Sequence, residues 1–445
     1  MNQQNQTFFS GKPPLLIVGA STRAAAFSAV RAGFRPVCVD QYADLDLLEI
    51  AEVLLKSENC SDWLETLNQR PPLDWIYTGA LENQPELIEQ INQKHQLRGC
   101  DPEILQRARD PFFLEQILSH KRIQALPCLP SHSLPDGTLK WLSKPLKGSA
   151  GHGIRFANAT TCDSLMNEDR YLQRYQSGIS LSALFISFRQ VTVLVGISRQ
   201  FIGNSAFNAA AFHFCGGVTL SPVAPSLRDS LEELGQTIAG QCQIRGIFGC
   251  DLLMEPEPPH EIWLTEVNPR YTALTELFEL QYRLPLLSWH CAACRSFEEH
   301  SPDTTPPKQL QKQLLQAEKQ PFNQISKGIL YAAEDVLCPA IEWKNPFSEG
   351  LYHVPECADI PGLGTAITAG APLCTIYGTG ENHETCLQSL AGTLVKNSRL
   401  FEPEICQPQH VSDVFRKLWS LNKPENLVFP GFFPSQNESH SFLED

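Results

Sequence analysis

The side chains best suited to chemistry stand in the run Glu-Val-Asn-Pro-Arg at residues 266–270, together with Asp251 upstream. Two carboxylates and a carboxamide oxygen are hard ligands of the kind that Mg²⁺ takes in proteins. We therefore predict that Asp251, Glu266 and Asn268 form a metal site and that Arg270 lies at its edge. An exposed hairpin with ordinary surface charges is the competing interpretation.

Two short segments, residues 248–254 and 261–268, carry these side chains, and a proline-rich turn separates them. If the segments pair as a hairpin that is symmetric about the turn, Asp251 falls opposite Glu266. Side chains alternate along a strand, so Glu266 and Asn268 share one face. The pattern thus predicts one patch that contains all three ligands.

A second chemical element is the glycine loop at residues 144–153, which lies between extended runs at 138–143 and 154–157. Glycines let backbone N–H groups crowd a phosphate, and lysines neutralise its charge. No Gly-Lys-Ser/Thr followed by a helix is present, so this is not a Walker loop. A plain hairpin loop is the alternative. The candidate phosphate-binding residues are Lys144, Lys147, Gly148, Ser149, Gly151 and Gly153.

The Asp…Glu-x-Asn-x-Arg signature on a late hairpin, preceded by a glycine loop with Lys-Pro at its start, resembles the ATP-grasp ligases. In that superfamily the acidic residues and the Asn hold two Mg²⁺ ions on the ATP phosphates, and the glycine loop is a flexible lid over them. The resemblance implies ATP and Mg²⁺ as cofactors. It also implies that Lys144 binds the α-phosphate and that Arg270 steadies an acyl-phosphate.

The run at residues 171–178 lies where the ATP-grasp superfamily has the strand that clamps adenine. The resemblance implies that Gln173, Arg174 and Tyr175 contact the base. The family usually has an acidic residue near the position of Gln173, but a Gln carbonyl oxygen can also accept from the adenine amino group. An amphipathic strand that binds no nucleotide is the other interpretation.

One position departs from the superfamily pattern. The ATP-binding domain of the superfamily often opens with Asp-Lys, whereas this chain has Asp110 followed by Pro111. The nucleotide contact that this Lys makes is therefore missing here. Arg109 and Lys121 are the cations that could replace it.

The chain begins with a β-α-β pattern, in which strands at 15–18 and 35–40 flank a small-residue helix. Asp40 suggests dinucleotide binding, but Gly19 is the single glycine of the turn, so the Gly-x-Gly-x-x-Gly fingerprint is incomplete. The resemblance implies instead a Rossmann-like domain on the acceptor side. Glu82 follows a further strand, where open α/β sheets bind ligands, although a helix-capping turn would use the same residues.

These elements predict a multidomain α/β and α+β chain with an ATP-grasp fold, an N-terminal Rossmann-like (pre-ATP-grasp) domain and a small C-terminal β domain. The C-terminal domain fits the biotin-carboxylase-like branch of the superfamily. The predicted limits are 13–108 for the Rossmann-like domain, 109–297 for the ATP-grasp domain, 298–321 for a linker, 322–400 for the C-terminal domain and 401–445 for a tail. Within the ATP-grasp domain we expect a lid subdomain at 125–180 and a metal-binding subdomain at 181–297.

Composition excludes several classes of protein. The chain has 445 residues and a net charge of −14, which argues against binding to nucleic acid. It has no apolar run of about 18 residues, so we expect no membrane span and a cytoplasmic location. Its 15 cysteines are odd in number and irregularly spaced, so we expect free thiols. The Cys-x-x-Cys at 291–294 lacks a second pair, and helix packing with buried thiols is expected there.

The resemblance implies an ADP-forming ligase that activates a carboxylate as an acyl-phosphate, from which an amine displaces phosphate. A small-molecule carboxylate and an amine are the expected partners, and a homodimer is left open. Short motifs are also similar to bacterial ATP-grasp proteins linked to tetrahydromethanopterin and methanofuran-type cofactor metabolism, such as tyramine–glutamate or tyrosine–glutamate ligases. A biotin-carboxylase-like or carbamoyl-transfer enzyme, and a nucleotide-binding regulatory protein without turnover, are the alternatives.

Overall fold

A parallel sheet opens the chain in the computed structural model, which describes residues 9–57, 59–133, 138–157, 169–256, 260–298, 304–320, 323–401 and 413–418. Its strand order is β3-β2-β1-β4-β5, and each strand is parallel to its neighbours. The predicted β-α-β start is therefore confirmed. The elements are β1 (Pro14–Gly19), α2 (Arg23–Arg31), β2 (Arg35–Asp40), α3 (Leu45–Ile50), β3 (Glu52–Lys56), α4 (Cys60–Asn68), β4 (Asp74–Tyr77), η1 (Leu81–Asn83), α5 (Pro85–Asn92) and β5 (Gln96–Leu97).

An antiparallel four-stranded sheet follows, in the order β7-β10-β8-β9. The helices α6 (Pro102–Ala108) and α7 (Pro111–Leu118) precede it, and each begins with a proline, which suits the first helical position because no N–H bond is needed there. The glycine loop joins β8 to β9 as the turn of a hairpin. The strands are β7 (Cys128–Pro130), β8 (Trp141–Pro145), β9 (Arg155–Ala157) and β10 (Arg170–Arg174).

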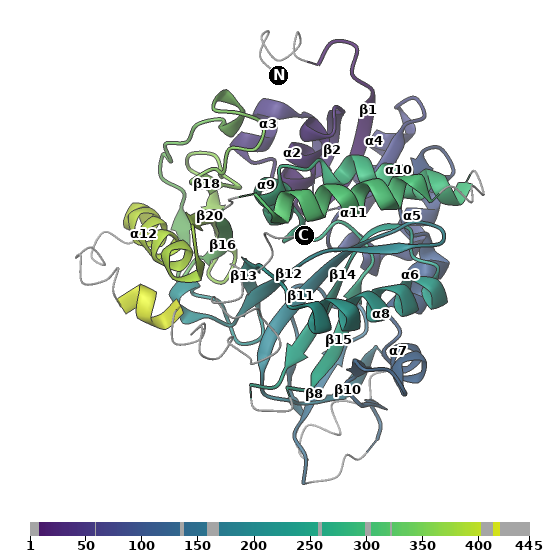
Figure 1. Ribbon diagram of the computed structural model, residues 1–445. Helices are drawn as coiled ribbons and strands as arrows, with labels where there is room; N and C mark the ends of the chain where they lie inside the picture. Colours follow the sequence, from purple (N-terminus) through teal and green to yellow (C-terminus); the bar gives the residue numbers. More distant parts are fainter. Residues whose placement is uncertain are drawn as a thin grey trace, which may run out of the picture.

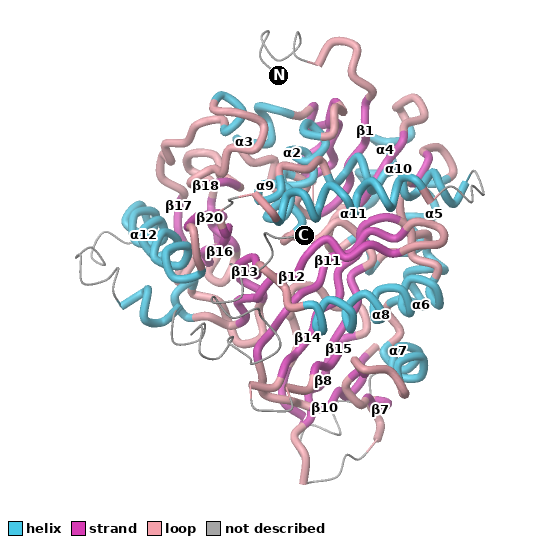
Figure 2. The backbone as a smooth tube through the Cα atoms, viewed as in Figure 1, coloured by secondary structure: helices cyan, strands magenta, loops and turns pink. Residues whose placement is uncertain are grey.

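The largest sheet has nine strands in the order β18-β20-β16-β13-β12-β11-β14-β15-β6 (Figures 1 and 2). Neighbouring strands are antiparallel, apart from β6, which is parallel to β15. Its strands are β6 (Gln124–Ala125), β11 (Ile179–Ser187), β12 (Thr192–Ile202), β13 (Phe214–Leu220), β14 (Gly246–Met254), β15 (Ile262–Asn268), β16 (Gln324–Tyr331), β18 (Cys357–Ala358) and β20 (Pro372–Gly380).

Helices cover both faces of the nine-stranded sheet. α8 (Pro225–Cys242) packs on one face, where Gly235 leaves room for the ring of Phe185. α9 (Thr275–Tyr282), α10 (Leu286–Glu298) and α11 (Thr305–Glu318) belong to a hydrophobic cluster that also contains Leu184 and Ile186 of β11 and the N-terminal helix α2. Figure 1 shows α10 and α11 side by side next to the N-terminal strands. The parallel sheet is thus packed onto the large one through these helices.

Residues 305–318, within the segment 298–321 that was predicted as a linker or an exposed helix, form helix α11. Leu310 and Leu314 of this helix are buried in the core. The two leucines are one helical turn apart, so they form an apolar stripe on a helix that is otherwise polar. The proline-rich and glutamine-rich composition concealed this stripe.

The C-terminal strands β16 and β20 extend the large sheet beside β13. Helix α12 (His383–Phe401) packs against both strands, and β17 (Val336–Leu337) pairs with β19 (Ala366–Ile367) in a separate two-stranded sheet. The short 3-10 helices η2 (Ser205–Phe207) and η3 (Pro346–Ser348) lie in connections. The predicted tail at 401–445 lies outside the described residues, except for Phe401 and residues 413–418. The remaining predicted domain limits stay predictions.

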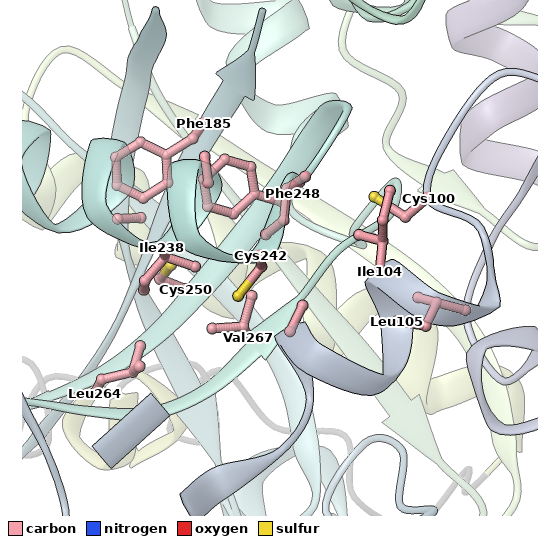
Figure 3. Close-up of a cluster of buried hydrophobic side chains, with 14 of the residues drawn as sticks. Cys100, Ile104, Leu105, Phe185, Ile238, Cys242, Phe248, Cys250, Leu264 and Val267 are labelled. Carbon is pink, nitrogen blue, oxygen red and sulfur yellow. The ribbon is translucent and has the colours of Figure 1, made fainter. Parts of the chain in front are cut away.

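A hydrophobic core lies on the α8 side of the β14–β15 hairpin (Figure 3). Cys250 of β14 and Val267 of β15 are buried in it. Because side chains alternate along a strand, the burial of these two residues directs Asp251, Glu266 and Asn268 to the opposite face. The core therefore decides which side of the hairpin carries the polar residues.

Two predictions from composition can be compared directly with the structure. The cysteine side chains that it describes carry free thiols, and Cys291 and Cys294 are buried in α10, as expected. Within the described ranges, no helix has both the length and the apolar character that a membrane crossing requires.

Candidate active site

The β14–β15 hairpin brings the predicted metal ligands together. Asp251 lies directly opposite Glu266, and Asn268 lies opposite Gly249. The amide Nδ2 of Asn268 donates to Asp251 Oδ2 at 3.1 Å and to Glu266 Oε1 at 3.3 Å. The placement that the hairpin pattern predicts is therefore confirmed for these three side chains.

The three side chains fit a hard divalent cation. Asn268 directs its NH₂ group at the two carboxylates, and a half-turn of the amide would direct its oxygen there instead. Among the described residues, no group of three or more His, Cys, Asp or Glu side chains is placed to hold a metal ion. A cation at Asp251, Glu266 and Asn268 would therefore take further oxygens from water or a phosphate, as Mg²⁺ commonly does.

The two carboxylates differ in their protonation. Burial and the facing Glu266 carboxylate raise the pKa of Asp251 to about 8. For Glu266, whose side chain is partly exposed, desolvation acts in the same direction, but the Lys144 ammonium, 3.8 Å from Oε2, and the hydrogen bonds with Asp251 and Asn268 together outweigh it and lower the pKa of Glu266. The hydroxyl of Ser182 and the amide of Gln200 each donate to Asp251 Oδ1 at 2.9 Å. These donors hold Asp251 in place without neutralising it.

Lys144, near the end of β8, provides a fixed positive charge beside the carboxylates. Its Nζ donates to Gln173 Oε1 at 3.2 Å and lies 5.8 Å from the centroid of the Tyr171 ring. Burial would lower the pKa of Lys144, but Tyr171 and Glu266 together raise it above its ordinary value. The side chain is therefore charged at neutral pH although it is buried.

The glycine loop is closed over this region. Arg109 donates to the Glu82 carbonyl at 2.8 Å and to the Gly148 carbonyl at 3.0 Å. Gly151 has a φ of +82°, and a Cβ at this position would lie 1.9 Å from the Phe212 carbonyl oxygen. A side chain there would therefore force the loop away. The loop thus contacts the N-terminal sheet region on one side and the β12–β13 connection on the other.

A first cavity lies between the glycine loop, β10 and β15. Arg109 and Pro111 line it, whereas Lys121 lies outside its lining and pairs with Glu233 at 3.3 Å. Of the two cations that could replace the missing Lys, the structure therefore places Arg109 at the cavity. The predicted site residues in its lining are Lys144, Gly148, Ser149, Gly151, Gln173, Glu266 and Asn268.

A second cavity, of about 430 Å³, adjoins the first at Glu266 and Asn268, which line both. One face of the large sheet, the first turns of the N-terminal region and the glycine loop enclose it. Arg270 lines this second cavity, where its Nε donates to Glu82 Oε1 at 2.7 Å and a second nitrogen donates to Asn268 Oδ1 at 3.4 Å. Glu266 and Asn268 therefore stand at the junction of the two cavities, and Asp251 and Arg270 line the second cavity beside them.

Four predicted residues line neither cavity: Lys147, Gly153, Arg174 and Tyr175. The guanidinium of Arg174 lies 5.1 Å from the centroid of the Trp263 ring. Neighbouring side chains on β10 point to opposite faces, and Gln173 takes the face towards the cavity. The structure therefore does not bring these four side chains together with the others.

A buried charged cluster, of which Arg23, Lys327 and Asp359 also line the second cavity, has no local signature in the sequence. Arg23 makes two hydrogen bonds to Glu276, at 2.8 and 3.1 Å, and two to Asp359, at 3.0 and 3.1 Å. Glu276 Oε1 also accepts from Lys327 at 2.6 Å and from the Tyr377 hydroxyl at 2.8 Å. Although burial opposes it, the two cations hold the pKa of Glu276 well below its usual range. Three distant parts of the chain supply this cluster.

The fold and the hairpin site define the class of protein. Residues 108–274 match the family model described as an ATP-grasp domain. The predicted fold class is confirmed, because the α/β and α+β architecture has the ATP-grasp fold. The matched residues include the glycine loop and the β14–β15 hairpin.

Several solved structures have a similar fold. A complex of biotin carboxylase from Campylobacter jejuni is 12% identical with a TM-score of 0.62, over 92% of this chain and 98% of that chain. An L-amino acid ligase from Bacillus licheniformis is 12% identical with a TM-score of 0.59, over 86% of this chain and 98% of that one. An N5-carboxyaminoimidazole ribonucleotide synthetase from Thermus thermophilus is 14% identical with a TM-score of 0.57, over 87% of this chain and 98% of that one. A search of curated protein sequences found no match.

Proposed function

We propose that this chain is an ATP-dependent ligase that joins a carboxylate to an amine through an acyl-phosphate, with Mg²⁺. The observation that carries the proposal is the position of Glu266 and Asn268 at the junction of the two cavities, with Asp251 directly opposite Glu266. A nucleotide in the first cavity would direct its terminal phosphate at this junction, and a carboxylate in the second cavity could approach it in line.

Mg²⁺ bound to these three side chains would neutralise charge on the phosphoryl group during its transfer. Asp251 and Glu266 supply carboxylate oxygens, and Asn268 supplies an amide oxygen after its rotation. Ser182 and Gln200 hold Asp251 in the orientation that the ion requires. The acidic pair is thus fixed before the ion arrives.

The glycine loop and Lys144 are proposed to hold the nucleotide. Lys144 is charged and faces the first cavity, which suits contact with the α-phosphate. Gln173 is proposed to accept from the adenine amino group. The loop would exclude water from the acyl-phosphate when closed. Gly148, Ser149 and Gly151, which line the first cavity, are proposed to complete the nucleotide site. Lys147, Gly153, Arg174 and Tyr175 line neither cavity, and their contact with the nucleotide stays a prediction from the resemblance.

Arg270 is proposed to steady the carboxylate and its acyl-phosphate. It lines the second cavity beside Asn268, and the Glu82 carboxylate fixes its orientation through the 2.7 Å bond. A guanidinium suits this role because it can present two parallel N–H groups to an oxyanion. Glu82 acts here by positioning Arg270.

We also propose particular substrates for the ligase. Ligation of glutamate to tyramine or tyrosine, in one-carbon cofactor biosynthesis of the tetrahydromethanopterin and methanofuran type, rests on the similarity of short motifs in the chain.

A homodimer is proposed because one similar structure, a biotin carboxylase domain of Hydrogenobacter thermophilus, is a dimer. The similarity to biotin carboxylase favours one alternative, a bicarbonate-activating enzyme. ADP release that requires an added amine favours the carboxylate–amine ligase, and ADP release without an amine favours the bicarbonate-activating enzyme.

The proposal is tested first by thermal unfolding with and without MgATP. A ligand that binds the folded state alone raises the unfolding midpoint. We expect a rise in the wild type and at most half of that rise in Lys144→Ala, because the variant lacks a buried charge at the first cavity. Lys140→Ala, which removes an exposed lysine just before the same strand, serves as the control and should match the wild type.

Two results of this test would contradict the proposal. The first is no rise in the wild type at millimolar MgATP. The second is an equal rise in Lys144→Ala and the wild type. If the expected pattern appears, release of ADP that requires both a carboxylate and an amine identifies the reaction class.

A further inference from the structure

One side of the second cavity is apolar and is left partly uncovered. Five apolar side chains line it, and each is half-buried: Ile154, Ile202, Phe212, Phe214 and Ile329. Apolar side chains that share one uncovered surface lose the free energy that burial would provide. Such a surface on the wall of a cavity of about 430 Å³ matches the size and character of small-molecule sites.

The fold builds this apolar wall from separate elements. Ile202 of β12 lies directly opposite Phe214 of β13, and Ile329 lies on β16, two strands from β12. Ile154 comes from the end of the glycine loop. Phe212 lies in the β12–β13 connection with a φ of +66°, a conformation that bulky side chains rarely adopt. The backbone therefore accepts a strained angle at a residue of the cavity lining, and the centroid of the Phe212 ring lies 5.6 Å from that of the Phe156 ring.

The opposite end of the same cavity is polar. Asp251, Gln200 and Arg270 line it there, and Gln200 donates to Asp251. Along β16 the inward side chains change from Lys327 to Ile329, which places the change from polar to apolar within one strand. A ligand that fills the cavity therefore meets charge at one end and hydrocarbon at the other.

We infer that the second cavity takes a substrate with a carboxylate or amine at one end and an apolar group of ring size at the other. This inference rests on the proposed function, because the charged end must reach the junction where the phosphoryl group is transferred. The apolar group would cover Ile202, Phe214 and Ile329, and the charged end would lie near Arg270 and the carboxylates.

The test compares probes that differ by a ring alone. The purified full chain is mixed with Mg²⁺ and a non-hydrolysable ATP analogue. Binding of 3-phenylpropionate is then compared with that of propionate, and binding of phenethylamine with that of ethylamine, by titration calorimetry. We expect at least one ring-bearing probe to bind at least tenfold more tightly than its short counterpart, because the ring covers apolar surface.

A matched pair of variants tests whether the preference for ring-bearing probes arises at the apolar wall. Ile329→Gln keeps the approximate size of the side chain but makes the wall polar, and should remove most of the ring preference. Leu337→Gln changes a leucine that is 69% exposed on the nearby strand β17 and should leave the preference unchanged. If Ile329→Gln does not fold, the comparison of probes on the wild type still decides the matter.

Failure of the inference and failure of the proposed function give different results. Equal binding of long and short probes by a chain that binds the ATP analogue overturns the inference and leaves the proposed function standing. Absence of analogue binding overturns the proposed function, and the ring preference is then measured on the nucleotide-free chain. A ring preference that Ile329→Gln does not reduce places the apolar group elsewhere and also overturns the inference.

Discussion

Asp251 and Glu276 are both carboxylates beside the second cavity, but their partners differ. Glu276 is bonded to two cations, Arg23 and Lys327, at 2.6 to 3.1 Å, and its pKa lies well below the usual range. Asp251 accepts hydrogen bonds from neutral donors and faces a second carboxylate, Glu266, and its pKa is raised to about 8.

The difference separates a structural cluster from a site that can bind a cation. The Arg23 cluster is complete, because each buried carboxylate in it already has a cationic partner, and such clusters chiefly stabilise one arrangement of the chain. In the β14–β15 pair, Asp251 is held by donors that carry no charge, and Glu266 has one cation, Lys144, at 3.8 Å. A pair of this kind gains free energy when a divalent ion binds, and perturbed carboxylates in a cavity are typical of functional sites.

The largest expected effect comes from removing one carboxylate of the hairpin. We expect Glu266→Gln to lower turnover by on the order of 1000-fold or more, because a ligand of the metal that stabilises the transferring phosphoryl group is lost. Its free energy of unfolding should stay within about 0.5 kcal/mol of the wild type, since the side chain is 48% exposed and repulsion with Asp251 is relieved. Steady-state ADP release and urea unfolding measure the two quantities.

The control for that variant is Glu261→Gln, which alters an exposed carboxylate near the start of the same hairpin strand. It should behave as the wild type in both assays. Near-normal turnover in Glu266→Gln would remove the basis for assigning the metal site.

The next largest effect, a loss of stability, is expected from the Arg23 cluster. Arg23→Met should lower the free energy of unfolding by about 3–5 kcal/mol, because Asp359 loses its bonded cation and Glu276 keeps Lys327 alone. Arg35→Met, which breaks a half-exposed pair with Glu52, should cost less than about 1 kcal/mol. Urea unfolding measures both. A loss below about 1 kcal/mol in Arg23→Met would show that the two regions do not differ in the way described.

A smaller effect on stability is expected from His290, whose pKa is shifted by burial and not by neighbouring charges. Burial lowers the pKa of His290 to about 4, and its ring nitrogens contact the Ile247 N–H and the Arg98 carbonyl. The unfolded chain takes up this proton near pH 6.5, so the stabilisation is fully present above about 6.5 and is lost as the pH falls towards 4. We expect a loss of about 3 kcal/mol from this group over that range.

Urea unfolding at a series of pH values measures that loss, with His290→Gln as the variant that lacks the titrating ring. The variant should be less stable at neutral pH and should lose less stability between about pH 6.5 and 4. An identical pH dependence in both proteins would show that burial alone does not shift pKa values here, and the raised pKa of Asp251 would then need another cause.

The site was predictable where its geometry is local. Asp251, Glu266 and Asn268 lie on two strands joined by a short turn, so strand alternation and the turn were enough to place them opposite one another. The glycine loop was recognisable from its composition, and its position over the carboxylates was implied by the resemblance to the ATP-grasp superfamily. The parallel start of the N-terminal sheet was predictable for the same local reason.

The rest depended on contacts between distant segments. Nothing near Asp251 in the sequence indicates that Ser182 and Gln200 bind it, because they lie on neighbouring strands of the sheet. The Arg23 cluster depends likewise on the pairing of β16 with β20 and on α9. Arg174 and Tyr175 were assigned from a resemblance along the run. Strand alternation separates the Arg174 side chain from Gln173, and Tyr175 follows the end of β10 and lines neither cavity.

The continuous nine-stranded sheet has a consequence for where the chain can be divided. The segment that matches the ATP-grasp model, residues 108–274, ends before β16. In the whole chain, residues 216–218 of β13 pair with residues 326–328 of β16. A chain that stopped at residue 274 would expose these backbone groups as an open sheet edge, and such edges promote self-association. The C-terminal strands therefore protect the rest of the molecule from aggregation as well as lining its second cavity.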